Sequence, residues 1–399
     1  MSAVLPDARQ AAAAAAGALP PALPPAPPAP RRAPGGGGAW TGVIVATLAV
    51  TALAPLLNLV VPAGSAFHLS DYALALTGKI MCYAICALAM DLIWGYTGIL
   101  SLGHGLFFAL GGYAMGMYLM RQIGRDGNYQ SDLPDFMVFL DWKALPWHWA
   151  LSDSFAATLV LVVAAPGLLA FVFGYFAFRS RIKGVYFSII TQALTFAAML
   201  LFFRNETGFG GNNGFTDFKR LLGIPIAQPS TRMALFVLTG LVLVGFFVFA
   251  RWLVASKFGR VLQAIRDAES RVMFCGYEPV AYKLAIWTLS AVMCGIAGAL
   301  YVPQVGIINP GEMSPAAGIE IAIWAAVGGR GTLVGPIVGA FFVNFAKSWF
   351  TQAFPEFWLY FLGALFIAVT LFLPNGIVGL LRRAGGLGAL VRRVRGGRP

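Results

Sequence analysis

The chain has 399 residues, of which 59% are hydrophobic and 11% are charged, and its mean hydropathy is +0.76. Because soluble domains carry about 25% charged residues, this composition excludes a water-soluble fold. The net charge of +12 does not indicate a nucleic-acid partner, since Lys and Arg stand in short connections beside apolar segments, where they set membrane topology and contact anionic lipid. We therefore predict an all-α, polytopic integral membrane protein with about ten transmembrane or re-entrant helices and no nucleic-acid partner.

Residues 1–39 open the chain with a run of Ala, Pro and Gly. A segment of this composition buries too little apolar surface to offset the entropy of ordering, so we predict a disordered cytoplasmic tail. A transmembrane domain is predicted over 40–380, followed by a basic cytoplasmic tail over 381–399. Within that domain, apolar segments close to the ~20 residues that cross a bilayer lie at 41–62, 72–94, 99–120, 155–178, 184–203, 233–255, 281–302, 317–329, 332–350 and 356–374.

The distribution of basic residues decides the predicted topology. The connection Arg179–Lys183, the loop 257–271 and the tail 381–399 are rich in Lys and Arg and should face the cytoplasm. All three do so, with both termini inside, when the chain breaks at Gly328–Gly331. The segment 317–329 is then too short to cross unaided, which predicts a broken or re-entrant helix surrounded by protein or a water-filled cavity. The two longest loops between spans fall outside, at 121–154 and 204–232.

No catalytic or metal site is predicted. The chain has no match to the glycine-rich loop followed by Lys and Ser or Thr that cradles phosphates. The histidines, His68, His104 and His148, lie far apart and in no zinc-ligand or catalytic spacing. Small apolar packing explains Cys82 and Cys86, which share a helix face. We therefore expect no enzyme activity and no cofactor bound by this chain, so that any energy it uses comes from a partner or a gradient.

The most informative polar segment is 256–279. Val261, Leu262, Ile265 and Ala268 form an apolar stripe at helical spacing, with charges on the remaining surface. Such a helix lies at the membrane surface or fills a groove in another protein, and the spacing alone leaves both open.

Residues 259–269 resemble the cytoplasmic coupling loop of the permeases in the branched-chain amino acid and urea family of ABC importers. In that family the loop docks onto the ATP-binding subunit. Many members follow the glutamate with a pair of alanines, whereas Ser270 and Arg271 follow Glu269 here. The resemblance assigns the docking contacts to Gly259, Arg260, Ala264, Ile265, Arg266, Asp267, Glu269 and Gly276.

The resemblance covers most of residues 72–380. The glycine-rich runs at 95–105 and 328–336 look like the entries to two core helices of the family. The runs at 210–219 and 354–360 look like the second permease of the urea-type transporter, which makes urea the leading substrate and branched-chain amino acids the second.

The resemblance implies a permease subunit in the bacterial cytoplasmic (inner) membrane that forms half of the pathway for a small polar solute. Its implied partners are a second permease subunit, two ATP-binding subunits that hold ATP and Mg, and an extracytoplasmic substrate-binding protein. A gradient-coupled secondary transporter is the alternative of another class, and it would need carboxylates near the bilayer midplane. A structural scaffold gives no reason for the amphipathic loop.

Polar residues inside the apolar segments should face protein or water; they are Lys79, Asp91, Gln192, Glu320, Asn344 and Lys347. We expect the pathway or gate to use Glu320, Asn344, Gln192 and His104. The alternatives are a structural hydrogen bond to a neighbouring helix for Glu320, and a backbone cap or a contact with lipid headgroups for His104. Glycines recur every four residues at Gly331, Gly335 and Gly339. They predict a bare helix face for close packing against a neighbour.

Overall fold

The computed structural model describes residues 36–380 except for 60, 63–64, 66–67 and 373–375. The tail predicted at 381–399 lies outside the described residues, as does the N-terminal tail up to residue 35. The backbone divides into a unit that ends at Gly42, with the first turns of helix α2, and a unit from Val43 onward, which holds every other described element.

Each predicted apolar segment is a helix. The long helices are α2 (Gly36–Leu59), α3 (Asp71–Thr97), α4 (His104–Arg121), α6 (Phe155–Arg179), α7 (Val185–Phe203), α8 (Pro229–Ala255), α10 (Pro279–Val305), α11 (Pro315–Gly328), α12 (Val334–Ala353) and α13 (Trp358–Phe372). Two further helices are α5 (Asp135–Phe139) and α9 (Lys257–Phe274). The 3-10 turns are η1 (Gly124–Asp126), η2 (Trp147–Ser152), η3 (Asn205–Thr207), η4 (Gly211–Asn213) and η5 (Pro310–Met313).

Strand structure in the described residues is limited to two short antiparallel pairs. One pair joins β1 (Phe215–Thr216) to β4 (Ile307–Ile308), and the other joins β2 (Arg220–Leu221) to β3 (Ile224–Pro225). The protein is therefore an all-α, polytopic membrane protein, as the composition predicts.

Six helices in the described part of the chain, α2, α3, α6, α7, α8 and α10, are long and apolar enough to cross a membrane. Helix α11 has 14 residues, which at 1.5 Å per residue is about 21 Å and shorter than the ~30 Å hydrocarbon core. The short segment predicted before the glycine break is thus a real feature of the fold.

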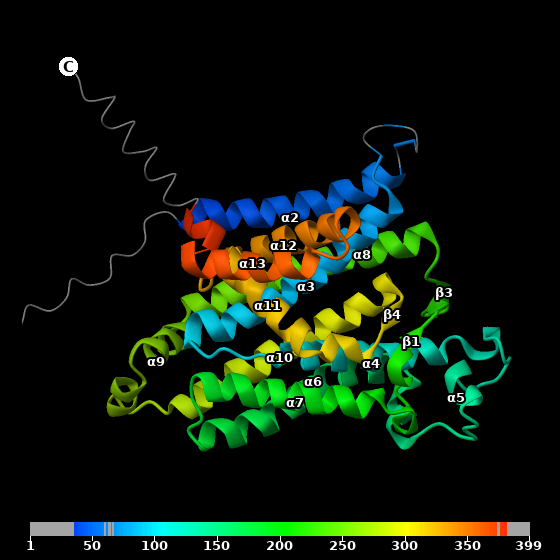
Figure 1. Ribbon diagram of the computed structural model, residues 1–399, viewed down its shortest axis with the longest axis horizontal. Helices are drawn as coiled ribbons and strands as arrows, with labels where there is room; N and C mark the ends of the chain where they lie inside the picture. The colour runs from blue at the N-terminus through cyan, green and yellow to red at the C-terminus, as the bar shows by residue number, and fades with distance from the viewer. Residues whose placement is uncertain (1–35, 60, 63–64, 66–67, 373–375, 381–399) are drawn as a thin grey trace, which may run out of the picture. The chain divides into compact units, whose positions relative to one another are not determined.

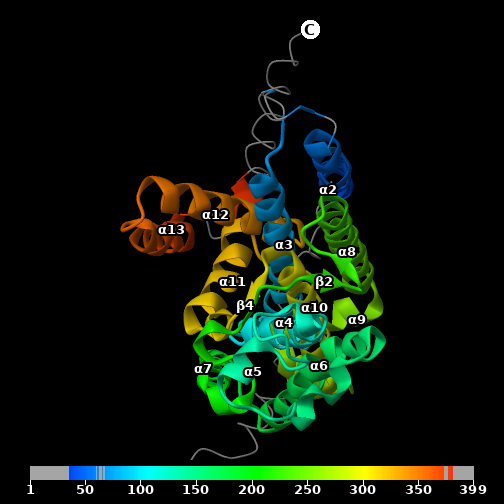
Figure 2. The same ribbon diagram turned by 90° about the vertical axis from the view of Figure 1, so that its right-hand side faces the viewer.

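Helices α3 and α10 form the centre of the bundle (Figures 1 and 2). In each of them 67% of the spanning window is buried, against 28% in α6. Helix α10 packs closely on α4 because both carry glycine at the contact: a Cβ on Gly111 would strike the Gly295 backbone, and one on Gly298 would strike the Phe108 carbonyl. Small residues allow this close backbone approach.

The two ends of the bundle differ (Figure 1). Helix α9 lies at one end, whereas α5 and the β-strands lie at the other. The loops predicted to share one side of the membrane, 121–154 and 204–232, do lie together there: buried Trp149 donates from Nε1 to the Gly208 carbonyl at 3.2 Å, and its ring contacts that of Phe215. We call these ends the α9 end and the loop end.

The predicted break between α11 and α12 is present. Helix α11 ends at Gly328, and the connection turns through Gly329 (φ 120°) and Gly331 (φ 73°), a region of backbone conformation that favours glycine. Leu333 also has a positive φ, 59°. Thr332 Oγ1 accepts the Gly335 amide at 2.8 Å and so caps the start of α12.

Candidate functional site

A cavity of about 380 Å³ opens between α3, α10 and α12. Hydroxyl, amide and ammonium groups supply its polar lining. We call it the α3–α12 cavity, and its polar side chains are those of Tyr72, Lys79, Tyr83, Gln304, Asn344, Lys347, Ser348, Thr351 and Gln352.

A second, smaller cavity of about 30 Å³ lies further along α3 toward the α9 end. It is large enough to hold ordered water. We call it the α11 cavity; its lining includes Tyr83, Cys86, Gly105, Glu312 and Glu320. Tyr83 contributes to the lining of both cavities, so the two are neighbours.

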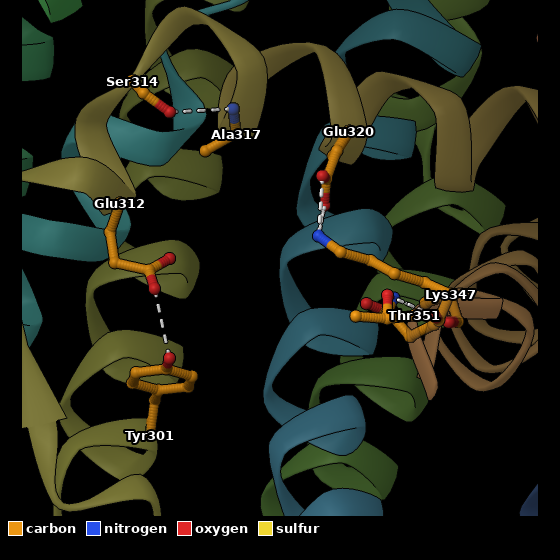
Figure 3. A network of polar contacts seen from close by, with 9 residues as sticks. Tyr301, Glu312, Ser314, Ala317, Glu320, Lys347 and Thr351 are labelled. Atoms are coloured by element: carbon orange, nitrogen blue, oxygen red, sulfur yellow. Dashed lines mark hydrogen bonds and ion pairs between the residues drawn. The ribbon is translucent and has the colours of Figure 1, made fainter. Parts of the chain in front are cut away.

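An ion pair connects a lining residue of one cavity to a lining residue of the other (Figure 3). Lys347 Nζ lies 2.8 Å from Glu320 Oε1 and 3.0 Å from Oε2. Glu320, on α11, lines the smaller cavity, whereas Lys347, on α12, lines the larger one. Their side chains are 14% and 34% exposed. Because an unpaired charge at this position is costly in lipid, the pair stabilises the contact between the two helices where their cavities adjoin.

A second carboxylate, Glu312 in η5, borders the α11 cavity. Its Oε1 accepts a hydrogen bond from the Tyr301 hydroxyl at 3.1 Å (Figure 3). The Lys79 ammonium lies 5.6 Å from the ring centroid of Tyr83 and 5.9 Å from that of Tyr301. At these distances a cation is attracted to the ring faces, so Lys79 is held beside the same aromatic cluster.

The ring of Tyr83 is itself fixed by stacking. Its centroid lies 4.8 Å from that of Trp324, on α11, and 5.7 Å from that of Tyr301, on α10. The aromatic side chain that lines both cavities is thus supported by two further helices.

Asp91, in α3, lies nearer the α9 end and is fully buried. Its Oδ1 accepts the Gly331 amide at 2.5 Å and its Oδ2 accepts the Leu333 amide at 3.0 Å. Tyr96, one turn further, donates its hydroxyl to the Gly331 carbonyl at 3.1 Å. The polar groups of Asp91 are therefore satisfied by the backbone between α11 and α12, and a buried carboxylate requires such partners.

Helix α9 begins at the N-cap Ser256, whose hydroxyl accepts the Gly259 amide. Leu262 and Ile265 of the predicted stripe are buried. The helix bends at Ala268, whose φ of −159° and ψ of 76° are non-helical. The amphipathic segment is therefore a helix whose apolar face packs on the bundle.

Two polar side chains of α9 bind other parts of this chain. Arg266 Nη1 donates to the Gly95 carbonyl, at the end of α3, at 2.7 Å. Glu269 accepts from Lys283 Nζ at 2.6 Å and from Lys183 Nζ at 2.8 Å. Burial alone would raise the pKa of the Glu269 carboxyl, but the two ammonium groups together outweigh burial and hold that pKa below its ordinary value.

The other residues assigned to docking by resemblance have varied surroundings. Gly259 and Ile265 are buried. A Cβ on Gly259 would strike the Val254 backbone, so the turn from α8 into α9 requires glycine there. The exposed members are Arg260, Ala264, Asp267 and Gly276.

The residues expected in a pathway or gate separate into two groups. Glu320 lines the α11 cavity and Asn344 the α3–α12 cavity, where its amide also donates to the Ala340 carbonyl of its own helix at 2.8 Å. Neither cavity has His104 or Gln192 among its described lining residues. His104 is fully buried, with Nε2 3.2 Å from Ser290 Oγ, and Gln192 is half-buried on α7.

The repeated glycines lie where helices approach closely. A Cβ on Gly339 would strike the Trp324 carbonyl and the Gly328 backbone, and one on Gly335 would strike the Gly329 carbonyl. Gly331 lies instead in the connection, against Gly95. Gly335 and Gly339 thus join α12 to α11, and Gly331 joins the connection to α3.

Sequence reasoning did not assign Glu312, Tyr301 or Tyr83 to the site. Glu312 had a usable signal, because it is a carboxylate that follows Asn309-Pro310-Gly311 directly between two apolar helices. The tyrosines had none, since aromatic residues are common in such helices. Among the described residues, no group of three or more His, Cys, Asp or Glu side chains could hold a metal ion.

Comparisons with known proteins agree with this architecture. Residues 72–370 match the family described as the branched-chain amino acid transport system / permease component. The high-affinity branched-chain amino acid transport system permease protein LivM of Salmonella typhimurium is 25% identical over 347 residues, which cover 81% of this chain and 74% of that protein. The permease protein BraD of Pseudomonas aeruginosa, of the same description, is 24% identical over 317 residues, 74% of this chain and 91% of that protein.

A more distant likeness is to the ribose import permease protein RbsC of Bacillus subtilis, 26% identical over 147 residues, which cover 35% of this chain and 42% of that protein. No solved structure matches the chain. Since the family match spans three-quarters of the sequence and includes α3, α9, α11 and α12, this multi-pass membrane protein belongs to the family of permease components of branched-chain amino acid transport systems.

Proposed function

We propose that the chain is one permease half of an ATP-driven importer in the bacterial cytoplasmic membrane. It pairs with a second permease subunit and two ATP-binding subunits, which hold ATP and Mg, and it receives its solute from an extracytoplasmic substrate-binding protein. The observation that carries the proposal is the order of features beside α3: the larger α3–α12 cavity, the Glu320–Lys347 pair, the small α11 cavity, and then the contact with α9.

Charge supports the orientation. Lys183, Lys283 and the basic residues of α9 gather at the α9 end, which is cytoplasmic under the positive-inside rule. At the loop end, by contrast, the aspartates Asp126, Asp132 and Asp153 pair with Arg220, Arg125 and Arg121, so the described residues there show no comparable excess of positive charge. With this orientation the α3–α12 cavity opens toward the outside and the ion pair lies between it and the cytoplasm.

The cavity's chemistry supports urea as the solute. Its described lining has hydroxyl and amide groups, which suit a small uncharged amide, and two lysines, but no carboxylate. The ammonium group of a zwitterionic amino acid would meet two lysines in this lining and no carboxylate to pair with. The carboxylates of Glu312 and Glu320 line the other, smaller cavity. The resemblance of residues 210–219 and 354–360 to the urea-type permease points the same way.

Branched-chain amino acids are the second candidate, because LivM and BraD are described as permeases for them. Accumulation of labelled urea and labelled leucine, measured in cells that express the whole transporter, separates the two. We expect urea to accumulate and an excess of leucine not to compete. Accumulation of leucine with no uptake of urea would show that the solute is a branched-chain amino acid, and the proposal of an importer would stand.

A further inference from the structure

We propose that Arg266 and Asp91 are positioning residues that carry movement of α9 to the junction between α11 and α12. This proposal rests on the importer function and deepens it, because it assigns the route from the cytoplasmic helix to the ion pair beside the α3–α12 cavity. Arg266 then acts within this chain, in addition to any contact that α9 makes with an ATP-binding subunit.

The first step of the route is the contact between α9 and the end of α3. Gly95 is in the last turn of α3, where backbone carbonyls have no partner inside the helix. Arg266 supplies one at 2.7 Å, and its positive charge lies at the negative end of the helix dipole. The aliphatic part of Arg266 also packs on Gly98, the left-handed residue that ends α3. A displacement of α9 therefore moves the end of α3.

The second step is the contact between the end of α3 and the α11–α12 connection. A Cβ on Gly95 would lie 2.5 Å from the Gly331 nitrogen and 2.7 Å from its Cα, so the two backbones touch. Asp91 binds the amides of Gly331 and Leu333, and Tyr96 binds the Gly331 carbonyl. Hydrogen bonds on both sides of Gly331 oblige the connection to follow α3.

The third step runs along the two helices that leave this connection. Glu320 lies in α11 before it, and Lys347 lies in α12 after it. The connection is the corner of a helical hairpin, and the ion pair joins its two arms (Figure 3). Because both arms leave this connection of positive-φ residues, a change of angle at the corner changes the distance between Glu320 and Lys347.

The test measures hydrogen exchange in the complete transporter in lipid nanodiscs, with and without ATP. Two peptides are followed, one from α9 and one covering residues 329–334. In the wild type, ATP should change the rate of hydrogen exchange of both peptides. Arg266→Met keeps the apolar stem but removes the donor, so we expect the α9 response to remain and the 329–334 response to disappear. Arg271→Met, an exposed change on the same helix, is the matched control and should behave as wild type.

Transport gives a second readout. In liposomes, Arg266→Met should keep hydrolysing ATP while the uptake per ATP falls by about fivefold or more, the size of a typical coupling between sites. Arg266→Lys retains a charged donor and should restore part of the coupling. Asp91→Asn, which replaces one of two acceptor oxygens, should reproduce the loss at the other end of the route.

Three results would overturn the relay. In the first, residues 329–334 of Arg266→Met still respond to ATP and uptake per ATP is unchanged. In the second, the α9 response of that variant disappears as well, which makes Arg266 a docking residue only. In the third, neither wild-type peptide responds to ATP, which sinks the proposed importer function and the relay with it.

Discussion

At the scale of single residues, the Glu320–Lys347 pair shows that two charged side chains within apolar helices pair with each other in the folded bundle. The side chains stand 27 positions apart in sequence, on different helices, and meet at 2.8 Å. Sequence reasoning could select both residues, because charges inside apolar segments must face protein or water. It could not pair them, since their contact depends on how sharply the chain turns between α11 and α12.

The pair gives the first prediction. Glu320→Gln leaves Lys347 charged and unpaired. Breaking a fully buried pair costs about 3–5 kcal/mol; the 34% exposure of the Lys347 side chain reduces this to about 1–2 kcal/mol. A free-energy change of this size shifts the equilibrium between pathway conformations about tenfold, so we expect solute uptake to fall by about that factor. The double variant Glu320→Gln/Lys347→Met should recover part of the uptake, because both charges are then absent.

Uptake into proteoliposomes, normalised to the amount of folded protein, measures this effect. Glu356→Gln, an exposed change between α12 and α13, is the control and should leave uptake unchanged. Wild-type uptake by Glu320→Gln would exclude a role for the pair in the pathway.

At the scale of elements, the helices and the break between α11 and α12 could be predicted, because apolar length and a Gly-Gly-Arg-Gly run are local signals. The apolar stripe of Leu262 and Ile265 also gave the buried face of α9 correctly. The bend at Ala268 and the contact of Arg266 with Gly95 could not be predicted, since both depend on where α9 meets α3 in the folded bundle.

The glycine contact between α11 and α12 gives the second prediction. Gly339→Ala would place a Cβ against the Trp324 carbonyl and the Gly328 backbone, and overpacking of this kind costs about 1–3 kcal/mol. We expect thermal unfolding in detergent to begin a few degrees lower. In Gly245→Ala the new Cβ meets no atom within 4 Å, so this control in α8 should keep or slightly raise stability. Equal unfolding temperatures for the two variants would contradict close packing at Gly339.

The attachment of α9 gives the third prediction, a dependence on pH. The folded pKa of Glu269 lies below its ordinary value of 4.5, so its ion pairs stabilise the attachment fully above about pH 4.5, and this contribution is lost as the pH falls through the lower, folded pKa. Hydrogen exchange of α9, corrected for intrinsic rates, should therefore rise in wild type on acidification. Glu269→Gln should already exchange faster at neutral pH and change less. An identical pH profile for the variant would show that Glu269 does not stabilise the attachment of α9.

At the scale of the whole molecule, the two ends of the bundle present different surfaces. Phe274, at the end of α9, is 92% exposed, and its neighbour Met273 is also exposed. An exposed aromatic side chain beside an amphipathic helix is typical of an anchor for another protein. Phe139 is similarly exposed but lies at the loop end.

This difference gives the fourth prediction. Phe274→Ser should weaken binding of the ATP-binding subunits by about 2 kcal/mol, the loss typical of an interface anchor. Phe139→Ser should leave it unchanged, because that residue is at the opposite end. Titration of purified ATP-binding subunit onto nanodisc-embedded permease gives both affinities, and equal losses in the two variants would show a general effect on folding.

ATP-dependent uptake of labelled urea into liposomes that contain the purified transporter tests the importer most directly. Its substrate-binding protein is added outside, and ATP with Mg is enclosed. We expect uptake that requires the enclosed ATP, requires the binding protein, and continues after ionophores collapse proton and sodium gradients. Uptake without ATP that stops when a gradient is collapsed would contradict the account and support a gradient-coupled transporter that uses Glu312 and Glu320.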